Sequence, residues 1–61
     1  MKSKITFTAF IYEEDMETCI DLFMDSDMEY VIEYAKSQGY DEVVNDITGE
    51  VVWSRPGFIR R

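Results

Sequence analysis

The chain has no histidine, a single cysteine and no long hydrophobic run. Without histidine, one chain cannot supply a Ser-His or Cys-His nucleophile, an imidazole base or a His-containing zinc site. Cys19 alone cannot form an internal disulfide, which argues against a stapled secreted scaffold and favours a reducing cytoplasm. The apolar stretch from Ile5 to Tyr12 contains two threonines and ends in three acidic residues. It is too short and too polar for a signal peptide or a membrane span.

Basic residues are also scarce, six against thirteen acidic ones, and the net charge is -7. All thirteen carboxylates lie between Glu13 and Glu50, where Lys36 is the only basic residue, so this window of 38 residues carries a net charge of -12. Such a field repels nucleic acid and anionic membranes and attracts basic protein surfaces. We therefore expect a basic protein partner, and neither direct nucleic-acid binding nor membrane binding.

The composition is nevertheless that of a folded chain. Hydrophobic residues make up 46% and aromatic residues 15% of the sequence, which is too apolar for a disordered acidic tail. The length of 61 residues predicts a single domain over 1–61, which buries only ~60% of the surface of its unfolded chain. Residues 56–61 are expected to form a loose basic tail.

Alternating side chains predict a β-hairpin in the first half of the chain. Between Lys4 and Tyr12 one alternating set carries threonines and aromatics, and the other is the expected core face. A second alternating segment runs from Glu17 to Met24. The expected core set of the first strand is Ile5, Phe7, Ala9 and Ile11.

A helix is predicted to follow this hairpin. Ser26 and Glu29 fit a capping box, with Ser26 as the N-cap, and Gly39 suits the left-handed position after the last turn, where Tyr40 can cover Ala35. The apolar stripe expected to face the sheet is Met28, Val31, Ile32 and Ala35.

Two further strands, Asp41 to Asn45 and Glu50 to Ser54, are predicted around a turn with a glycine bulge at Gly49. The order β-β-α-β-β predicts an α+β fold, a mostly antiparallel four-stranded sheet with one helix packed on one face. If Asn45 pairs with Glu50, then one face of the last hairpin carries Val44, Val51 and Trp53, and the other carries Val43 and Val52.

One helix covers only one face of such a sheet, so a second face should remain open. An exposed apolar patch usually marks an interface, with a partner or with a second copy; alternatively, Phe58 and Ile59 fold over it. The residues expected on this second face are Phe10, Tyr12, Phe23, Val43 and Val52, beside Asp21 and Asp25.

Tyr30 and Tyr34 are expected on the flank and back of the helix, away from its apolar stripe, with Glu29 and Glu33 beside them. Tyrosine is common at interface hot spots, although solvent-exposed tyrosines without a role are common too. The candidate partner-binding residues are Phe10, Tyr12, Asp21, Phe23, Asp25, Glu29, Tyr30, Glu33 and Tyr34.

No catalytic, cofactor-binding or metal-binding residue is predicted. Asp25 to Glu29 imitates the start of a calcium loop, but the sixth position is Tyr30 where such loops need glycine. The carboxylates from Glu13 to Glu17 are better explained as a hairpin loop. Cys19 lacks a basic neighbour that would activate its thiol. We expect a protein that is not an enzyme.

The helix region, with Asp27, Met28, Tyr30, Tyr34 and Ala35 after two amino-terminal strands, resembles the small Dmd antitoxins of T-even-type phages. Those proteins neutralise host RNase toxins by binding over the active groove. The resemblance implies a small acidic phage or mobile-element protein that binds and blocks a host enzyme. It does not extend to the strand at Val51 to Trp53.

These observations lead to two hypotheses. In the first, the chain is a phage or mobile-element inhibitor that occludes a basic, nucleic-acid-binding site on a host protein, such as a nuclease toxin or a defence enzyme. In the second, it is a self-associating structural or regulatory module that pairs its open sheet face with another copy. Antitoxin, anti-restriction and anti-CRISPR roles all require the same small acidic binder.

Overall fold

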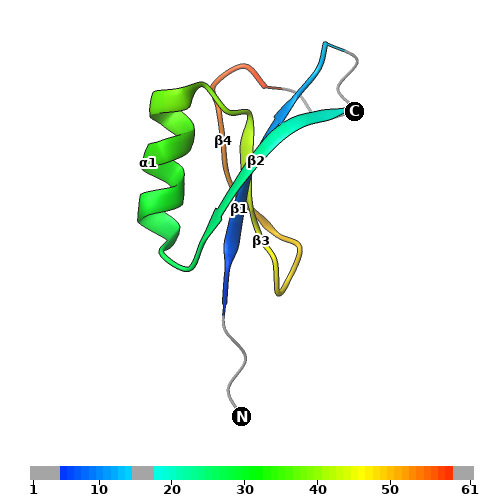
Figure 1. Cartoon of the computed structure of the whole chain (residues 1–61). Helices are drawn as coiled ribbons and strands as arrows, with labels where there is room; N and C mark the ends of the chain where they lie inside the picture. The colour runs from blue at the N-terminus through cyan, green and yellow to red at the C-terminus, as the bar shows by residue number, and fades with distance from the viewer. Residues whose placement is uncertain (1–4, 15–17, 59–61) are drawn as a thin grey trace.

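A computed structural model describes residues 5–14 and 18–58. These residues form a four-stranded sheet of order β2-β1-β3-β4 in which all neighbours are antiparallel, and the helix lies along one face (Figure 1). The predicted α+β fold with the order β-β-α-β-β is confirmed. The elements are β1 (Phe7–Tyr12), β2 (Cys19–Asp25), α1 (Met28–Gln38), β3 (Glu42–Asn45) and β4 (Val51–Ser54).

The core lies between α1 and the two central strands. Ala9 of β1, Val43 of β3 and the helical residues Val31 and Ala35 are completely buried, and Tyr40 closes the cluster. Phe7 and Ile11 pack against it from β1. The core set predicted for β1 is thus confirmed at Phe7, Ala9 and Ile11, whereas Ile5 is exposed. No helix in the described ranges is long and apolar enough to cross a membrane.

The helix begins one residue later than predicted. Asp27, and not Ser26, is the N-cap: its Oδ1 accepts the N–H groups of Glu29 at 3.1 Å and Tyr30 at 3.3 Å. Asp25 Oδ1 accepts the N–H of Ser26 at 2.7 Å, which keeps Ser26 in the turn before the helix. The predicted end of the helix is confirmed, because Gly39 adopts φ of 76°.

The β3–β4 hairpin pairs as predicted at its turn but not further along. The Asn45 N–H donates to the Glu50 carbonyl at 2.8 Å. A bulge between Val43 and Val44 then places Val44 opposite Val51, and Val43 opposite Trp53. The expectation that Trp53 shares the face of Val44 is therefore wrong, because the extra residue of a bulge reverses which side chains point to each face.

The predicted composition of the second sheet face is confirmed at Phe10 and Tyr12 and is wrong for the other residues. Val52, which was also expected there, packs against the core. Phe23 pairs with Ala9, and residues directly opposite in an antiparallel pair point to the same face, so Phe23 lies on the helix side. Asp21 and Asp25 share that side, and Val43 is buried beneath the helix. The face away from the helix, here called the open face, carries Thr8, Phe10, Tyr12, Ile20, Leu22, Met24, Glu42, Val44 and Val51.

Candidate protein-binding surface

Four aromatic rings from β2, α1 and the segment after α1 meet along one edge of the core. The Phe23 ring stacks on Tyr34 with 3.9 Å between centroids, and Tyr30 meets Phe23 edge-on at 5.8 Å. Tyr40 meets Tyr34 edge-on at 5.5 Å. We call these four residues the aromatic seam. Tyr34 was expected on the flank and back of the helix, away from its apolar stripe, but its ring is half-buried between Phe23 and Tyr40.

Asp21 is held at one end of the seam. Its Oδ2 accepts the hydroxyl of Tyr40 at 2.9 Å, and its Oδ1 accepts the N–H of Leu22 at 2.9 Å. Burial raises the pKa of the Tyr40 hydroxyl above its ordinary value, and the hydrogen bond to Asp21 raises it further. Asp21 therefore stabilises the fold and is only partly available to a partner.

Several other carboxylates also have partners within the fold. Tyr12 OH donates to Glu42 Oε2 at 2.5 Å, and the Glu42 side chain is only 1% exposed. Asp46 Oδ2 accepts the hydroxyl groups of Thr6 and Thr8, both at 2.7 Å. The sequence showed one acidic window, whereas the fold divides it into carboxylates that hold the chain together and carboxylates that face solvent.

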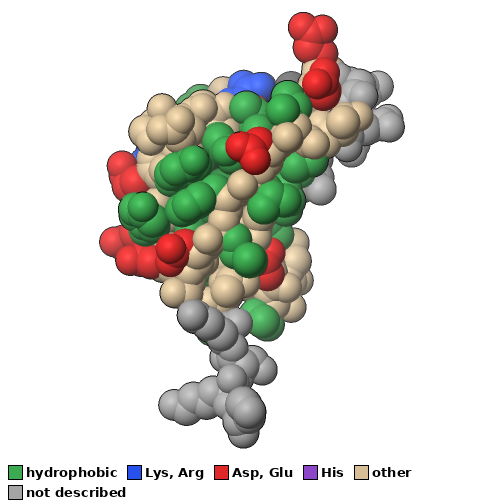
Figure 2. Space-filling model, in the orientation of Figure 1, with side chains coloured by type: hydrophobic (Ala, Val, Ile, Leu, Met, Phe, Trp, Pro, Cys, Tyr) green, Lys and Arg blue, Asp and Glu red, His purple; other side chains and the backbone are tan. Residues whose placement is uncertain are grey.

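The solvent-facing carboxylates include Glu29 and Glu33 of α1. Tyr30 lies beside them and is 53% exposed. We call Glu29, Tyr30 and Glu33 the acidic helix face. Lys36 approaches Glu33 at 3.6 Å, but both side chains are well exposed, so this ion pair is weak. Figure 2 shows hydrophobic side chains spread over the helix and the neighbouring strand, with carboxylates along the outer margin of the helix.

The nine predicted partner-binding residues separate into two groups. Phe10 and Tyr12 lie on the open face, on the other side of the sheet from the helix. The remaining seven occupy two adjoining elements that contact each other. These seven are Asp21, Phe23 and Asp25 on β2, and Glu29, Tyr30, Glu33 and Tyr34 on α1.

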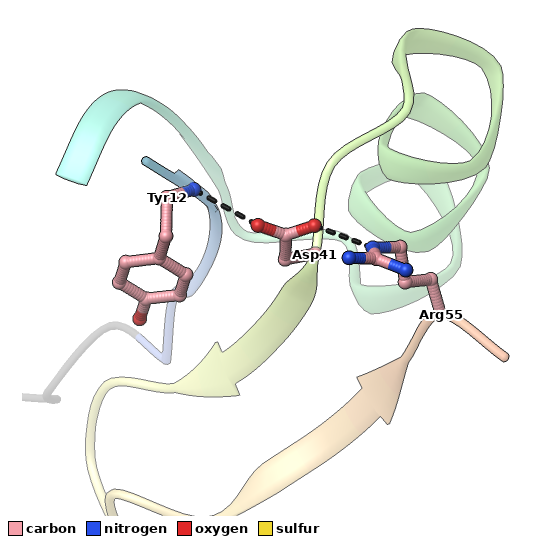
Figure 3. Close-up of polar contacts among 3 residues, drawn as sticks. All are labelled: Tyr12, Asp41 and Arg55. Carbon is pink, nitrogen blue, oxygen red and sulfur yellow. Dashed lines mark hydrogen bonds and ion pairs between the residues drawn. The ribbon is translucent and has the colours of Figure 1, made fainter. Parts of the chain in front are cut away.

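Tyr12 is held in place by the segment after β4 (Figure 3). Asp41 accepts the Tyr12 N–H at 2.9 Å through Oδ2, and its Oδ1 contacts Arg55 Nε at 2.5 Å. The Phe58 ring stacks on Tyr12 at 6.1 Å. Phe58 thus covers part of the open face, as the alternative interpretation of the sequence suggested, whereas Ile59 and the rest of the expected basic tail lie outside the described residues.

A cavity of about 440 Å³ lies between the C-terminal end of α1 and the end of β4. It was not predicted, because it depends on the packing of Trp53 under the helix, which the bulge determines. The cavity offers an apolar floor with a cationic rim, and no acid–base pair. Its lining residues are Ala35, Lys36, Gly39, Tyr40, Trp53, Arg55 and Pro56. Within residues 5–14 and 18–58, no three metal-ligating side chains gather into a cluster.

Comparisons with protein-family models, with curated proteins and with solved structures find no match to this chain. The resemblance to the Dmd antitoxins therefore stays a prediction.

Proposed function

We propose that this chain is a non-enzymatic inhibitor from a phage or mobile element. It binds a basic, nucleic-acid-binding site on a host protein in the bacterial cytoplasm and occludes that site. The observation that carries the proposal is the acidic helix face: Glu29 and Glu33 lie one turn apart in solvent beside Tyr30, whose ring meets Phe23 edge-on.

The support for this surface is physical. Glu29 and Glu33 have few constraints within the fold, so their charge is available to a cationic partner. Tyr30 offers a large apolar ring with a polar hydroxyl, the combination that is enriched at interface hot spots. Phe23, which is itself stacked on Tyr34, contacts the ring of Tyr30 edge-on and restricts its motion, so that less conformational entropy is lost on binding.

The expected partner is a nuclease or another nucleic-acid enzyme. Such an enzyme carries a cationic groove whose own ligand binds largely through phosphate charge. Carboxylates on a small rigid domain can occupy that groove and speed encounter with it. The electrostatic share of the affinity should fall as salt rises, while the contribution of Tyr30 should persist.

The proposal is tested by capture from nuclease-treated bacterial lysate with the tagged chain, at low and at moderate salt. We expect a basic enzyme to be retained at low salt and partly released at higher salt. In the double variant Glu29→Gln and Glu33→Gln, retention should fall at least about tenfold, as expected for charges that meet a cationic site. Asp21 stays unchanged in this test because its substitution would disturb Tyr40.

The matched control is Glu13→Gln with Glu14→Gln, which removes the same charge from the exposed loop after β1. If both double variants lose retention equally, then net charge alone and not the acidic helix face attracts the partner. Retention that is unchanged in the helix variant at low salt would contradict the electrostatic basis of the proposal.

A further inference from the structure

The strand β2 lies at one edge of the sheet and exposes large apolar side chains. In the order β2-β1-β3-β4, only β1 pairs with it among the described residues. Its open face carries Ile20, Leu22 and Met24, which are 56%, 54% and 56% exposed. Its other face carries Phe23 in the aromatic seam. An edge strand with exposed apolar side chains invites pairing with another strand.

The hydrogen bonds between β1 and β3 show which residues of β1 remain to bond with β2, and therefore which residues of β2 face away from β1. Asp46 N–H donates to the Thr6 carbonyl, so Thr6, Thr8 and Phe10 direct their backbone groups toward β3. The alternate residues of β1 therefore bond to β2 through Asp21, Phe23 and Asp25.

It follows that Leu22 and Met24 direct their backbone N–H and C=O groups away from the sheet, while Ile20 is the extra residue of a bulge in the pairing of β2 with β1. One of these groups already has a partner, since the Leu22 N–H donates to Asp21 Oδ1 at 2.9 Å. The side chain of Asp21 can release this N–H to another acceptor and keep its bond to Tyr40.

A second copy of this strand fits that edge. If two β2 strands pair antiparallel about a two-fold axis at Leu22, Ile20 lies opposite Met24 of the other copy and Leu22 lies opposite itself. On the helix side, Asp21 then lies opposite Phe23 of the other copy. No carboxylate faces another directly, and all the exposed apolar side chains of β2 join one continuous stripe.

The same two-fold axis places the two helices on one side of a joined eight-stranded sheet. The two β1 strands would lie about 14 Å apart, three interstrand spacings. The tyrosines that flank each helix toward β2, Tyr30 and Tyr34, would then face each other across the Phe23 rings. This arrangement covers the seam from both sides.

We propose that the chain forms a two-fold dimer through antiparallel pairing of β2 with β2 of a second copy, centred on Leu22. This surface differs from the dimer face expected from the sequence, whose residues do not share one face. The inference does not depend on the proposed function, since it concerns the contact between copies.

The salt dependence of the dimer should be opposite to that of a basic partner. Each copy carries a net charge of -7, so the two copies repel each other at long range. Added salt screens this repulsion and should tighten the dimer, whereas it weakens binding to a cationic groove. Changing the salt concentration therefore distinguishes the dimer from a complex with a basic partner.

The test is sedimentation equilibrium of the full chain at low and moderate salt, for wild type and for Leu22→Glu. We expect a wild-type dimer that tightens with salt, and at least about a tenfold loss of association in Leu22→Glu, where two carboxylates would meet at the axis. The matched control is Ile47→Glu, which introduces the same charge at a side chain that is 57% exposed in the β3–β4 turn. A wild-type monomer at all salt concentrations, or equal loss in both variants, would overturn the proposal.

A second measurement, disulfide cross-linking, tests the register of the β2–β2 pair through the gain of a covalent dimer. It does not rely on a loss of association. Across a hydrogen-bonded antiparallel pair the Cα atoms lie about 5.5 Å apart, within the range that a disulfide bridges. In a Cys19→Ser background, Leu22→Cys should form a covalent dimer under mild oxidation, and Ile47→Cys should not. Equal cross-linking of the two variants would contradict the proposed axis.

Discussion

Asp21 shows how far the role of one residue depends on contacts that are distant in sequence. A carboxylate in an alternating strand next to other carboxylates looked like part of a charged surface. In the fold, its two oxygens accept hydrogen bonds from Tyr40 and from the backbone of Leu22. Tyr40 reaches it only because the left-handed turn at Gly39 directs the chain back toward β2. Local periodicity contains no information on such a contact.

The first prediction concerns the hydroxyl of Tyr40. In an unfolded chain a tyrosine ionises at pH about 10, and the fold raises this pKa. The folded state therefore binds more protons than the unfolded state at alkaline pH, so the free energy of unfolding falls as the pH rises above that value. Tyr40→Phe should lower stability near neutral pH, where the hydrogen bond to Asp21 is intact, and should show a smaller alkaline loss.

Urea unfolding near neutral pH and above pH about 10 measures both effects. Tyr30→Phe is the matched control, because its ring belongs to the same seam but is 53% exposed. An alkaline loss that is the same in Tyr40→Phe as in wild type would mean that the buried hydroxyl does not link folding to pH.

The secondary-structure elements were predictable, but the faces of β2 and β4 and the start of the helix were not. The alternation in β1, the helical stripe and the turn at Gly49 all correspond to observed elements. In β2, periodicity favours Ile20, Leu22 and Met24 as the side toward the helix, because the alternate set carries two aspartates. The structure places that alternate set on the helix side, where Phe23 stacks on Tyr34. In β4, the bulge opposite Val43 reverses which side chains point toward the helix. No residue type in that hairpin predicts the bulge.

The end of the helix allows a second prediction, about the cap. Because Asp27 Oδ1 accepts two N–H groups of the first turn, Asp27→Ala should lower the free energy of unfolding by about 1 kcal/mol. Ser26→Ala should cost much less, since its hydroxyl does not cap the helix. Chemical unfolding of the two variants compares them directly. The reverse ranking would restore Ser26 as the N-cap.

The whole molecule explains why the candidate surface was only partly visible in the sequence. The acidic window predicted a cationic partner class, yet the fold uses Asp21, Asp27, Asp41, Glu42 and Asp46 internally. Only the folded chain shows which charges remain for a partner. Tyr30 belongs both to the acidic helix face and to the seam that the proposed dimer covers, so the binding of a basic enzyme and the formation of the dimer compete for this side chain.

The most direct test of occlusion is a competition on the captured enzyme after its purification. A fluorescent oligonucleotide bound to that enzyme is titrated with the chain, at low and at moderate salt, and its release is followed by anisotropy. The account predicts complete release of the oligonucleotide, with more chain required as salt rises and more still for Glu29→Gln with Glu33→Gln. A stable complex of enzyme, oligonucleotide and chain together would contradict the claim that the acidic helix face occupies the nucleic-acid site.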